Sequence, residues 1–137
     1  MTTTKITKYS VTDQDYDART YKLFGANFSM NFEPQVFDAA RKLSTEYEGG
    51  TWDFFSLSNG GFFMSPRSDK CFNASCPSEA RVKMSAEGLG IAACLYAFSR
   101  LSFGRGADAE TFGRHYYLLR AFMFEHLEAP VILRATD

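Results

Sequence analysis

Residues 47–66 read YEGGTWDFFSLSNGGFFMSP, and this stretch carries the strongest structural signal in the chain. Two aromatic segments flank the tetrapeptide SNGG at positions 58–61. Asn59 and Gly60 tolerate the positive φ angles that a two-residue hairpin turn needs, and the twist of that turn matches the twist of the strands. The stretch therefore predicts a β-hairpin with strands over residues 51–57 and 61–65, and Pro66 ends the second strand.

A helix over residues 34–47 is predicted before the hairpin. Pro34 suits its first turn, where the missing N–H is no loss, and Gly49 and Gly50 follow its last turn. Four apolar residues recur at the spacing of one helix face. They are Val36, Ala40, Leu43 and Tyr47. This pattern is typical of an amphipathic helix that packs on a core.

Two further long helices follow the hairpin. Ser85 can cap the first, which runs to about residue 103. Its residues 89–98 are apolar apart from Gly90, which indicates a central buried helix. Asp108 can cap the second, which runs to about residue 126. Its apolar face contains Phe112, Tyr116, Leu119 and Met123.

The remaining segments carry weaker signals. In residues 1–20 the apolar residues show no sustained periodicity, so this segment is interpreted as a flexible N-terminal tail. An extended or irregular piece around Gly25 follows it. Short strands are predicted over residues 71–75 and 81–84, and a short helix over residues 130–135. Short steps between such strands favour an antiparallel meander.

These elements together predict an α+β fold. We expect one domain over residues 21–137, in which a small antiparallel meander of three or four strands packs among three main helices and a short C-terminal helix. A chain of 137 residues with 14 Phe can build such a core without metals or disulfides. No apolar run reaches the ~18 residues of a membrane span, and no signal-peptide pattern is present. Three cysteines, an odd number, fit a reducing compartment, so we expect a cytoplasmic protein.

The charge balance argues against two nucleic-acid roles. Fifteen basic residues stand against 16 acidic ones, which leaves a net charge of −1. A DNA-binding module normally carries a basic stripe that neutralises phosphates. A protein that imitates duplex DNA needs the opposite, one negative charge per roughly 1.7 Å of axis. The sequence therefore predicts neither strong nucleic-acid binding nor DNA mimicry.

No pattern of metal ligands or nucleophiles is convincing. Cys71 and Cys76 are separated by four residues, and His115 and His126 by ten, whereas zinc sites use shorter ligand spacings. The two histidines would lie about three turns apart on one helix. A cysteine with His115 could form a nucleophile and base on paper, but no local signature supports this pair. We expect no metal, no cofactor and no catalytic residue.

Other motifs have simpler explanations. The glycine pairs at 49–50 and 60–61 lack the Lys-Ser or Lys-Thr of a phosphate-binding loop, so turn formation explains them. The aromatic residues of the hairpin could stack on single-stranded nucleic acid, but without interleaved basic residues core packing is favoured. Arg114, His115 and Arg120 form a polar-aromatic patch with Tyr116 and Tyr117. His115 could contact a partner or lie half-buried at the core edge, and the second interpretation is favoured.

Several segments agree in order and spacing with one known family. They are Phe24-Gly25, Tyr47-Glu48-Gly49-Gly50 with Trp52, Leu57-Ser58-Asn59-Gly60-Gly61-Phe62, Met64 with Pro66, Met84-Ser85-Ala86, Gly90-Ile91, Ala93-Cys94-Leu95, His115-Tyr116, Leu119-Arg120, Glu125-His126 and the end from Ile132 to Asp137. In these segments the chain resembles the ArdB/KlcA antirestriction proteins. The resemblance spans residues 24–137, whereas residues 1–20 and 71–83 diverge.

The resemblance implies a small cytoplasmic α+β protein of mobile elements that relieves type I restriction of incoming DNA. Together with the charge balance, it suggests a non-catalytic contact with a protein of the host restriction system or an associated factor. The expected contact residues are Ser58, Asn59, Gly60, Gly61, Arg114, His115 and Arg120. A DNA-associated accessory factor and a small hydrolase are the alternatives.

Overall fold

The computed structural model describes residues 5–75, 81–104 and 106–136. In chain order the elements are β1 (Lys8–Val11), α1 (Asp13–Phe24), the π-helical turn η1 (Phe28–Phe32), α2 (Glu33–Leu43), β2 (Trp52–Leu57), β3 (Phe62–Pro66), β4 (Cys71–Ser75), β5 (Arg81–Ser85), α3 (Ala86–Ser102), α4 (Ala107–Phe124) and α5 (Ala129–Thr136). The predicted α+β fold is confirmed. Within this described part of the chain, no helix is both long and apolar enough to cross a membrane.

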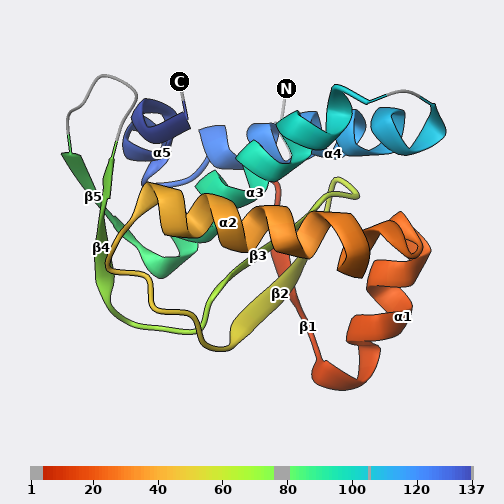
Figure 1. Ribbon diagram of the computed structural model, residues 1–137, viewed down its shortest axis with the longest axis horizontal. Coiled ribbons are helices and arrows are strands. Elements are labelled where there is room, and N and C mark those ends of the chain that lie inside the picture. Colours follow the sequence, from red (N-terminus) through yellow and green to blue (C-terminus); the bar gives the residue numbers. More distant parts are fainter. Residues whose placement is uncertain (1–4, 76–80, 105, 137) are drawn as a thin grey trace.

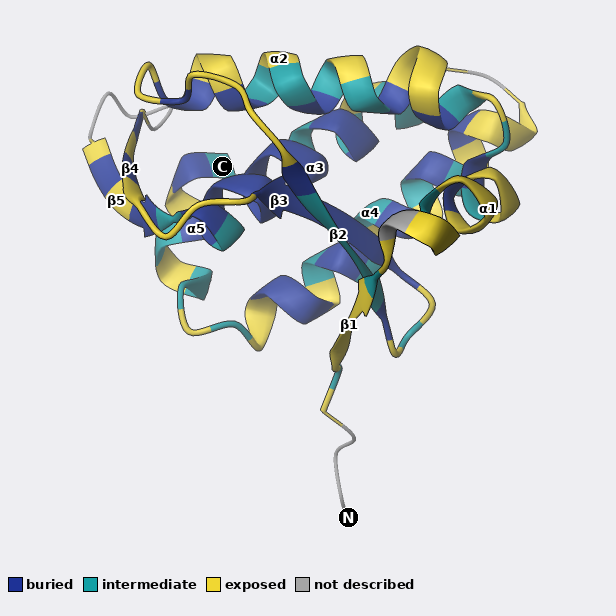
Figure 2. Cartoon of the chain, turned by 90° about the horizontal axis from the view of Figure 1, so that it is seen from below, coloured by how far each residue is buried: buried dark blue, intermediate teal, exposed yellow. Residues whose placement is uncertain are grey.

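Helix α3 lies at the centre of the molecule. It packs between α2 and α4, and β3 passes along a further side (Figure 1). Figure 2 shows α3 and β3 as largely buried, whereas α2 exposes the side that faces away from α3. The apolar run over residues 89–98 therefore forms the predicted central helix, because each of its faces meets another element.

Gly90 allows β3 to approach α3 closely. A Cβ atom at this position would lie 2.4 Å from the carbonyl oxygen of Met64 and 2.4 Å from the Cβ of Ser65. Real Cβ atoms do not come so near to other heavy atoms. The absence of a side chain at Gly90 therefore sets the distance between the central helix and the sheet.

The five strands form two sheets rather than the single predicted meander. The first sheet has the order β1-β2-β3, and β2 pairs antiparallel with β3 so that Phe54 lies opposite Met64. The second contains only β4 and β5, with Phe72 opposite Met84. The strands at 71–75 and 81–85 were predicted, but β4 does not continue the first sheet. The side of β3 away from β2 packs against α3, which leaves no room for another strand.

The N-terminal segment departs most from its prediction. Residues 8–24, interpreted as a flexible tail and the start of an irregular piece, instead form β1 and α1. Strand β1 pairs antiparallel with β2, placing Lys8 opposite Leu57 and Val11 opposite Phe54. Thr12 caps α1 by accepting a hydrogen bond from the N–H of Asp15. The strand shows no apolar alternation because its side chains are mostly exposed, and its partner lies more than 40 residues away in the sequence.

Helix α2 also ends earlier than predicted, at Leu43 rather than residue 47. Ser44 has an extended backbone with φ −141° and ψ 121°, and its carbonyl accepts from the N–H of Tyr47. Tyr47 is still buried, and its hydroxyl accepts a 2.8 Å hydrogen bond from the indole N–H of Trp52. Tyr47 therefore reaches the core as the apolar spacing predicted, although its backbone lies outside the helix.

Candidate interaction surface

The hairpin turn lies directly against α4, as the predicted contact surface requires. The side-chain amide of Asn59 donates a 2.9 Å hydrogen bond to the carbonyl of Leu118, and its Oδ1 accepts from the N–H of Gly61 at 2.9 Å. A Cβ on Gly61 would lie 3.1 Å from the Cβ of Leu118. Asn59 therefore fixes the position of the turn on the helix, and Ser58 and Gly60 are exposed beside it. Gly61 was also expected to contact a partner, but it is buried under the turn, so this expectation is corrected.

The geometry of this turn differs from the predicted two-residue type. The N–H of Gly60 donates to the carbonyl of Leu57 at 3.0 Å, and the N–H of Leu57 donates to the carbonyl of Gly61 at 2.9 Å. Three residues therefore separate the last hydrogen-bonded pair, and Gly60 has a φ of 92°. This pattern is typical of a three-residue hairpin loop with a glycine bulge.

The surface of α4 beside the turn is aromatic and basic. We name it the α4 outer face and define it by Arg114, Tyr117, Arg120, Ala121 and Phe124. Tyr117 is 70% exposed and Phe124 50% exposed. The guanidinium of Arg120 lies over the ring of Phe124, 4.7 Å from its centroid. Leu127, in the turn after α4, is 99% exposed. Arg114 and Arg120 were expected here as contact residues and Tyr117 as their neighbour in the predicted patch, whereas Phe124 was not singled out.

His115 does not belong to this surface. It is 3% exposed, and its ring packs against Phe24 and Phe98 with centroids 4.7 and 5.7 Å away. Burial, and then the nearby charge of Arg114, lowers its pKa from 6.5 to about 4. Its Nδ1 atom is buried and has no hydrogen-bond partner among the residues that the structure describes. The proposed contact of His115 with a partner is thus corrected, because the aromatic core removes the side chain from the surface.

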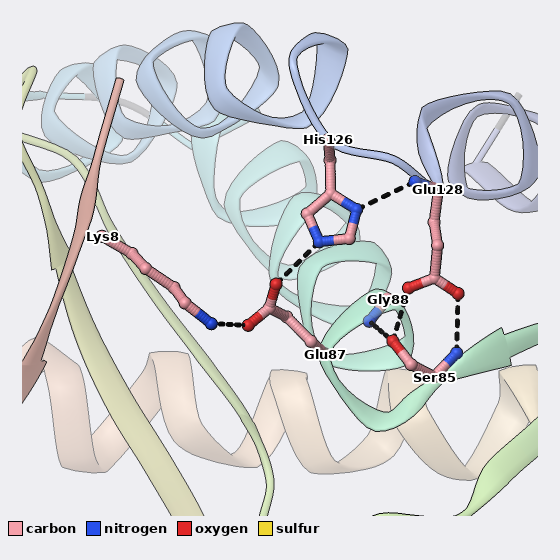
Figure 3. A network of polar contacts seen from close by, with 6 residues as sticks. All are labelled: Lys8, Ser85, Glu87, Gly88, His126 and Glu128. Atoms are coloured by element: carbon pink, nitrogen blue, oxygen red, sulfur yellow. Dashed lines mark hydrogen bonds and ion pairs between the residues drawn. The ribbon is translucent and has the colours of Figure 1, made fainter. Parts of the chain in front are cut away.

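A polar network joins segments that are far apart in the sequence (Figure 3). Glu87, in the first turn of α3, pairs with Lys8 of β1 and accepts a 2.7 Å hydrogen bond from Nε2 of His126. Nδ1 of His126 accepts from the N–H of Glu128 at 3.0 Å. The hydrogen bond from His126 and then the pairing with Lys8 lower the pKa of Glu87 despite its partial burial.

The second half of this network holds the start of α3. Ser85 donates its hydroxyl and its N–H to the two carboxylate oxygens of Glu128, and the N–H contact measures 2.8 Å. The Ser85 oxygen in turn accepts from the N–H of Gly88 at 3.1 Å, as an N-cap should. The predicted cap by Ser85 is confirmed. Glu87 and Glu128 were not singled out from the sequence, where only the acidic first turn of α3 could have marked Glu87.

The contacts of the Ser85 hydroxyl are those of a helix cap. It donates to the Glu128 carboxylate and accepts from the N–H of Gly88. Cys94 is fully buried, and burial raises its thiol pKa to about 12. Cys71 is exposed in β4, and Cys76 lies outside the described residues. Across the described ranges, no three His, Cys, Asp or Glu side chains gather as metal ligands would.

Comparison with known proteins connects this arrangement to a family. The sequence model of the antirestriction proteins matches residues 45–137, which include the hairpin, α3, α4 and α5. This chain belongs to the antirestriction protein family. The matched region contains the complete α4 outer face and four of the five side chains of the polar network. Only Lys8 of that network lies before it.

Two individual proteins of similar sequence were also found. The chain is 43% identical to the uncharacterized protein YafX of Escherichia coli K12 over 110 residues, which cover 77% of this chain and 70% of YafX. It is 38% identical to an antirestriction protein KlcA of Escherichia coli over 108 residues, covering 77% of this chain and 74% of KlcA. The resemblance to the ArdB/KlcA proteins is thereby confirmed.

A solved structure shares the whole antirestriction fold. It comes from a study of the KlcA and ArdB proteins, described as having a novel fold and antirestriction activity against type I DNA restriction systems in vivo but not in vitro. Its superposition has a TM-score of 0.90 at 30% sequence identity and covers all of both chains. The shared fold therefore includes β1 and α1, although the family sequence model begins only at residue 45.

Proposed function

We propose that this antirestriction protein relieves type I restriction of incoming DNA in the cell through a protein–protein contact made by the α4 outer face and the adjoining hairpin turn. The partner is a protein of the host restriction system or a factor that acts with it. The proposal depends chiefly on one observation: Tyr117 and Phe124 are exposed on one helix beside Arg120.

The chemistry of this face favours a protein as the partner. Tyr, Phe and Arg are enriched in the centres of protein interfaces, where they supply most of the binding free energy. The hydrogen bond from Asn59 to Leu118 holds the turn in place, so Ser58 and Gly60 extend the α4 outer face without further ordering. A surface that is already ordered loses little conformational entropy on binding.

Two further observations support a mechanism without catalysis or DNA mimicry. The net charge of −1 supplies neither the basic stripe of a DNA-binding module nor the dense negative charge of a duplex. The structural relative is described as active in vivo but not in vitro. An inhibitor that needs a further cellular protein would show this behaviour, whereas a competitive DNA mimic would act on the purified enzyme.

The proposal is tested by plating unmodified phage on a restricting host that expresses the protein. The Tyr117→Ala/Phe124→Ala double variant removes two exposed side chains of the α4 outer face, the Arg120→Ala variant removes a half-buried one, and both leave the core intact. We expect each to lower the relief of restriction by at least about tenfold, as for residues central to an interface. Tyr9→Ala and Arg41→Ala, which remove exposed side chains of the same types elsewhere, should retain full relief.

Circular dichroism and expression level establish that each variant is folded and present in the cell. Full relief by both folded α4 variants would remove the α4 outer face from the mechanism. Salt-dependent retention of the wild-type protein on duplex DNA would instead favour a DNA-associated accessory factor. Product formation from DNA or nucleotide by the purified protein would favour a hydrolase.

A further inference from the structure

A cavity of about 300 Å³ lies at the corner where α1 meets η1 and the start of α2. Its lining includes three aromatic residues, Tyr16, Tyr21 and Phe28, and two acidic residues, Asp17 and Glu33. No Lys, Arg or His belongs to the lining. The cavity thus combines aromatic walls with negative charge, and it is separate from the α4 outer face.

Its two carboxylates are available to a ligand. In the described part of the chain, the ion pairs involve neither Asp17 nor Glu33. Glu33 Oε2 accepts a 2.7 Å hydrogen bond from the Tyr16 hydroxyl, which orients the carboxylate and leaves lone pairs on both oxygens. Burial and then Glu33 raise the pKa of Tyr16, so its hydroxyl stays protonated and keeps donating.

The walls of the cavity are preorganised. The ring of Tyr16 packs against Phe28 with centroids 5.6 Å apart and against Phe54 at 4.0 Å. Phe28 is 3% exposed, so this wall belongs to the core. Tyr21, which also lines the cavity, is 70% exposed. A rigid pocket is therefore bordered by an exposed aromatic side chain.

We propose that this cavity binds the cationic end of a basic side chain, arginine or lysine, presented by a partner protein. A cation gains from the exposed ring of Tyr21 and from the two carboxylates together, because the ring quadrupole and the negative charge both favour it. The cavity is large enough for the side chain, and its lining holds no cation that would repel it. The exposed ring of Tyr21 supplies apolar contact at the cavity, which suits a protein surface better than a free polyamine.

The test is an NMR titration of the ¹⁵N-labelled full chain with N-acetyl-arginine methylamide. We expect saturable shifts of the backbone amides of Gly25, Ala26 and Ser29, which line the cavity. The citrulline analogue has nearly the same shape without the charge and should bind at least about tenfold more weakly. Binding of the arginine probe should also weaken with added salt, because the charges lie near the surface.

The Asp17→Asn/Glu33→Gln double variant removes both charges and keeps an acceptor for the Tyr16 hydroxyl. It should lose at least about tenfold in affinity for the arginine probe and leave citrulline binding unchanged. The Asp69→Asn/Glu110→Gln variant removes two exposed charges elsewhere and should bind like the wild type.

Three results would overturn this assignment. They are the absence of saturable shifts at the cavity, equal binding of the citrulline analogue, and full binding by the Asp17→Asn/Glu33→Gln variant. Spermidine is titrated in parallel to identify the source of the cation. If it shifts the same amides at clearly lower concentration than an arginine-containing peptide does, the ligand is a free polyamine and the protein partner is refuted.

Discussion

The thiol of Cys94 in α3 binds both backbone groups of Met64 in β3. Sγ accepts a hydrogen bond from the Met64 N–H at 3.4 Å and donates to the Met64 carbonyl at 3.5 Å. Strand β3 is an edge of its sheet, so these groups have no strand partner on that side. A buried thiol on the central helix thus provides hydrogen-bond partners for the free N–H and carbonyl of a strand edge inside the core.

Replacing this thiol tests its role. Cys94→Ala leaves the buried Met64 N–H and carbonyl unpaired and opens a small cavity, so we expect a loss of about 2 kcal/mol in the free energy of unfolding. Cys94→Ser retains a donor and an acceptor and should lose less. Urea denaturation measures both values. Equal stability of Cys94→Ala and the wild type would show that the sulfur contacts contribute nothing.

Gly90 in α3 and Gly113 in α4 should respond to alanine in opposite ways. Gly90→Ala places a methyl group 2.4 Å from Met64 and Ser65, so we expect a loss of more than about 2 kcal/mol. At Gly113 the added Cβ would meet Ser102 at 3.6 Å, an ordinary contact. Gly113→Ala should therefore stabilise the protein by up to about 1 kcal/mol through helix propensity. Thermal unfolding of the pair measures the contrast, and a harmless Gly90→Ala would contradict the close approach.

Burial of His115 predicts a loss of stability in acid. Its pKa falls from 6.5 to about 4 on folding, so between these values the unfolded chain binds a proton that the folded protein does not. Stability therefore decreases as the pH falls through this interval, by up to about 3 kcal/mol. His115→Leu should lack this contribution, while His126 is present in both proteins. Urea denaturation between pH 7 and about 4 measures the free energy of unfolding of both proteins. This free energy should fall more steeply with decreasing pH in the wild type than in His115→Leu, and identical slopes would contradict the prediction.

Glu87 contributes stability with a different pH dependence. Its folded pKa lies below the ordinary value of 4.5, because His126 and Lys8 favour the carboxylate. The stabilisation is therefore complete above that value and is lost as the pH falls through the lower folded pKa. Glu87→Gln removes the carboxylate, so we expect it to lower the free energy of unfolding at neutral pH. Below about pH 4.5, the free energy of unfolding of this variant should also depend less on pH than that of the wild type. Unfolding midpoints across this range measure both effects, and an unchanged slope would exclude Glu87 as a contributor.

Features with a strong local signal were predictable from the sequence. The aromatic segments around positions 58–61 predicted the hairpin, and the apolar run at 89–98 predicted a buried central helix. The helical period of α4 placed Phe112, Leu119 and Met123 on its inner face. It placed Tyr116 on this face as well, whereas His115 was expected to contact a partner or to lie half-buried at the core edge. The structure buries His115 against Phe24 and leaves Tyr116 half-buried.

The sequence by itself determined helices α2 to α5, the hairpin and the near-neutral charge, because helical periodicity, turn residues and net charge depend only on neighbouring residues or on composition. Tertiary structure alone decided the pairing of β1 with β2, the separation into two sheets and the contacts of Lys8, Glu87 and His126. It also assembled the α1–η1 cavity and brought the turn onto α4. These features join groups that are distant in the sequence. Their contacts form only when the chain folds, so no local sequence pattern predicts them.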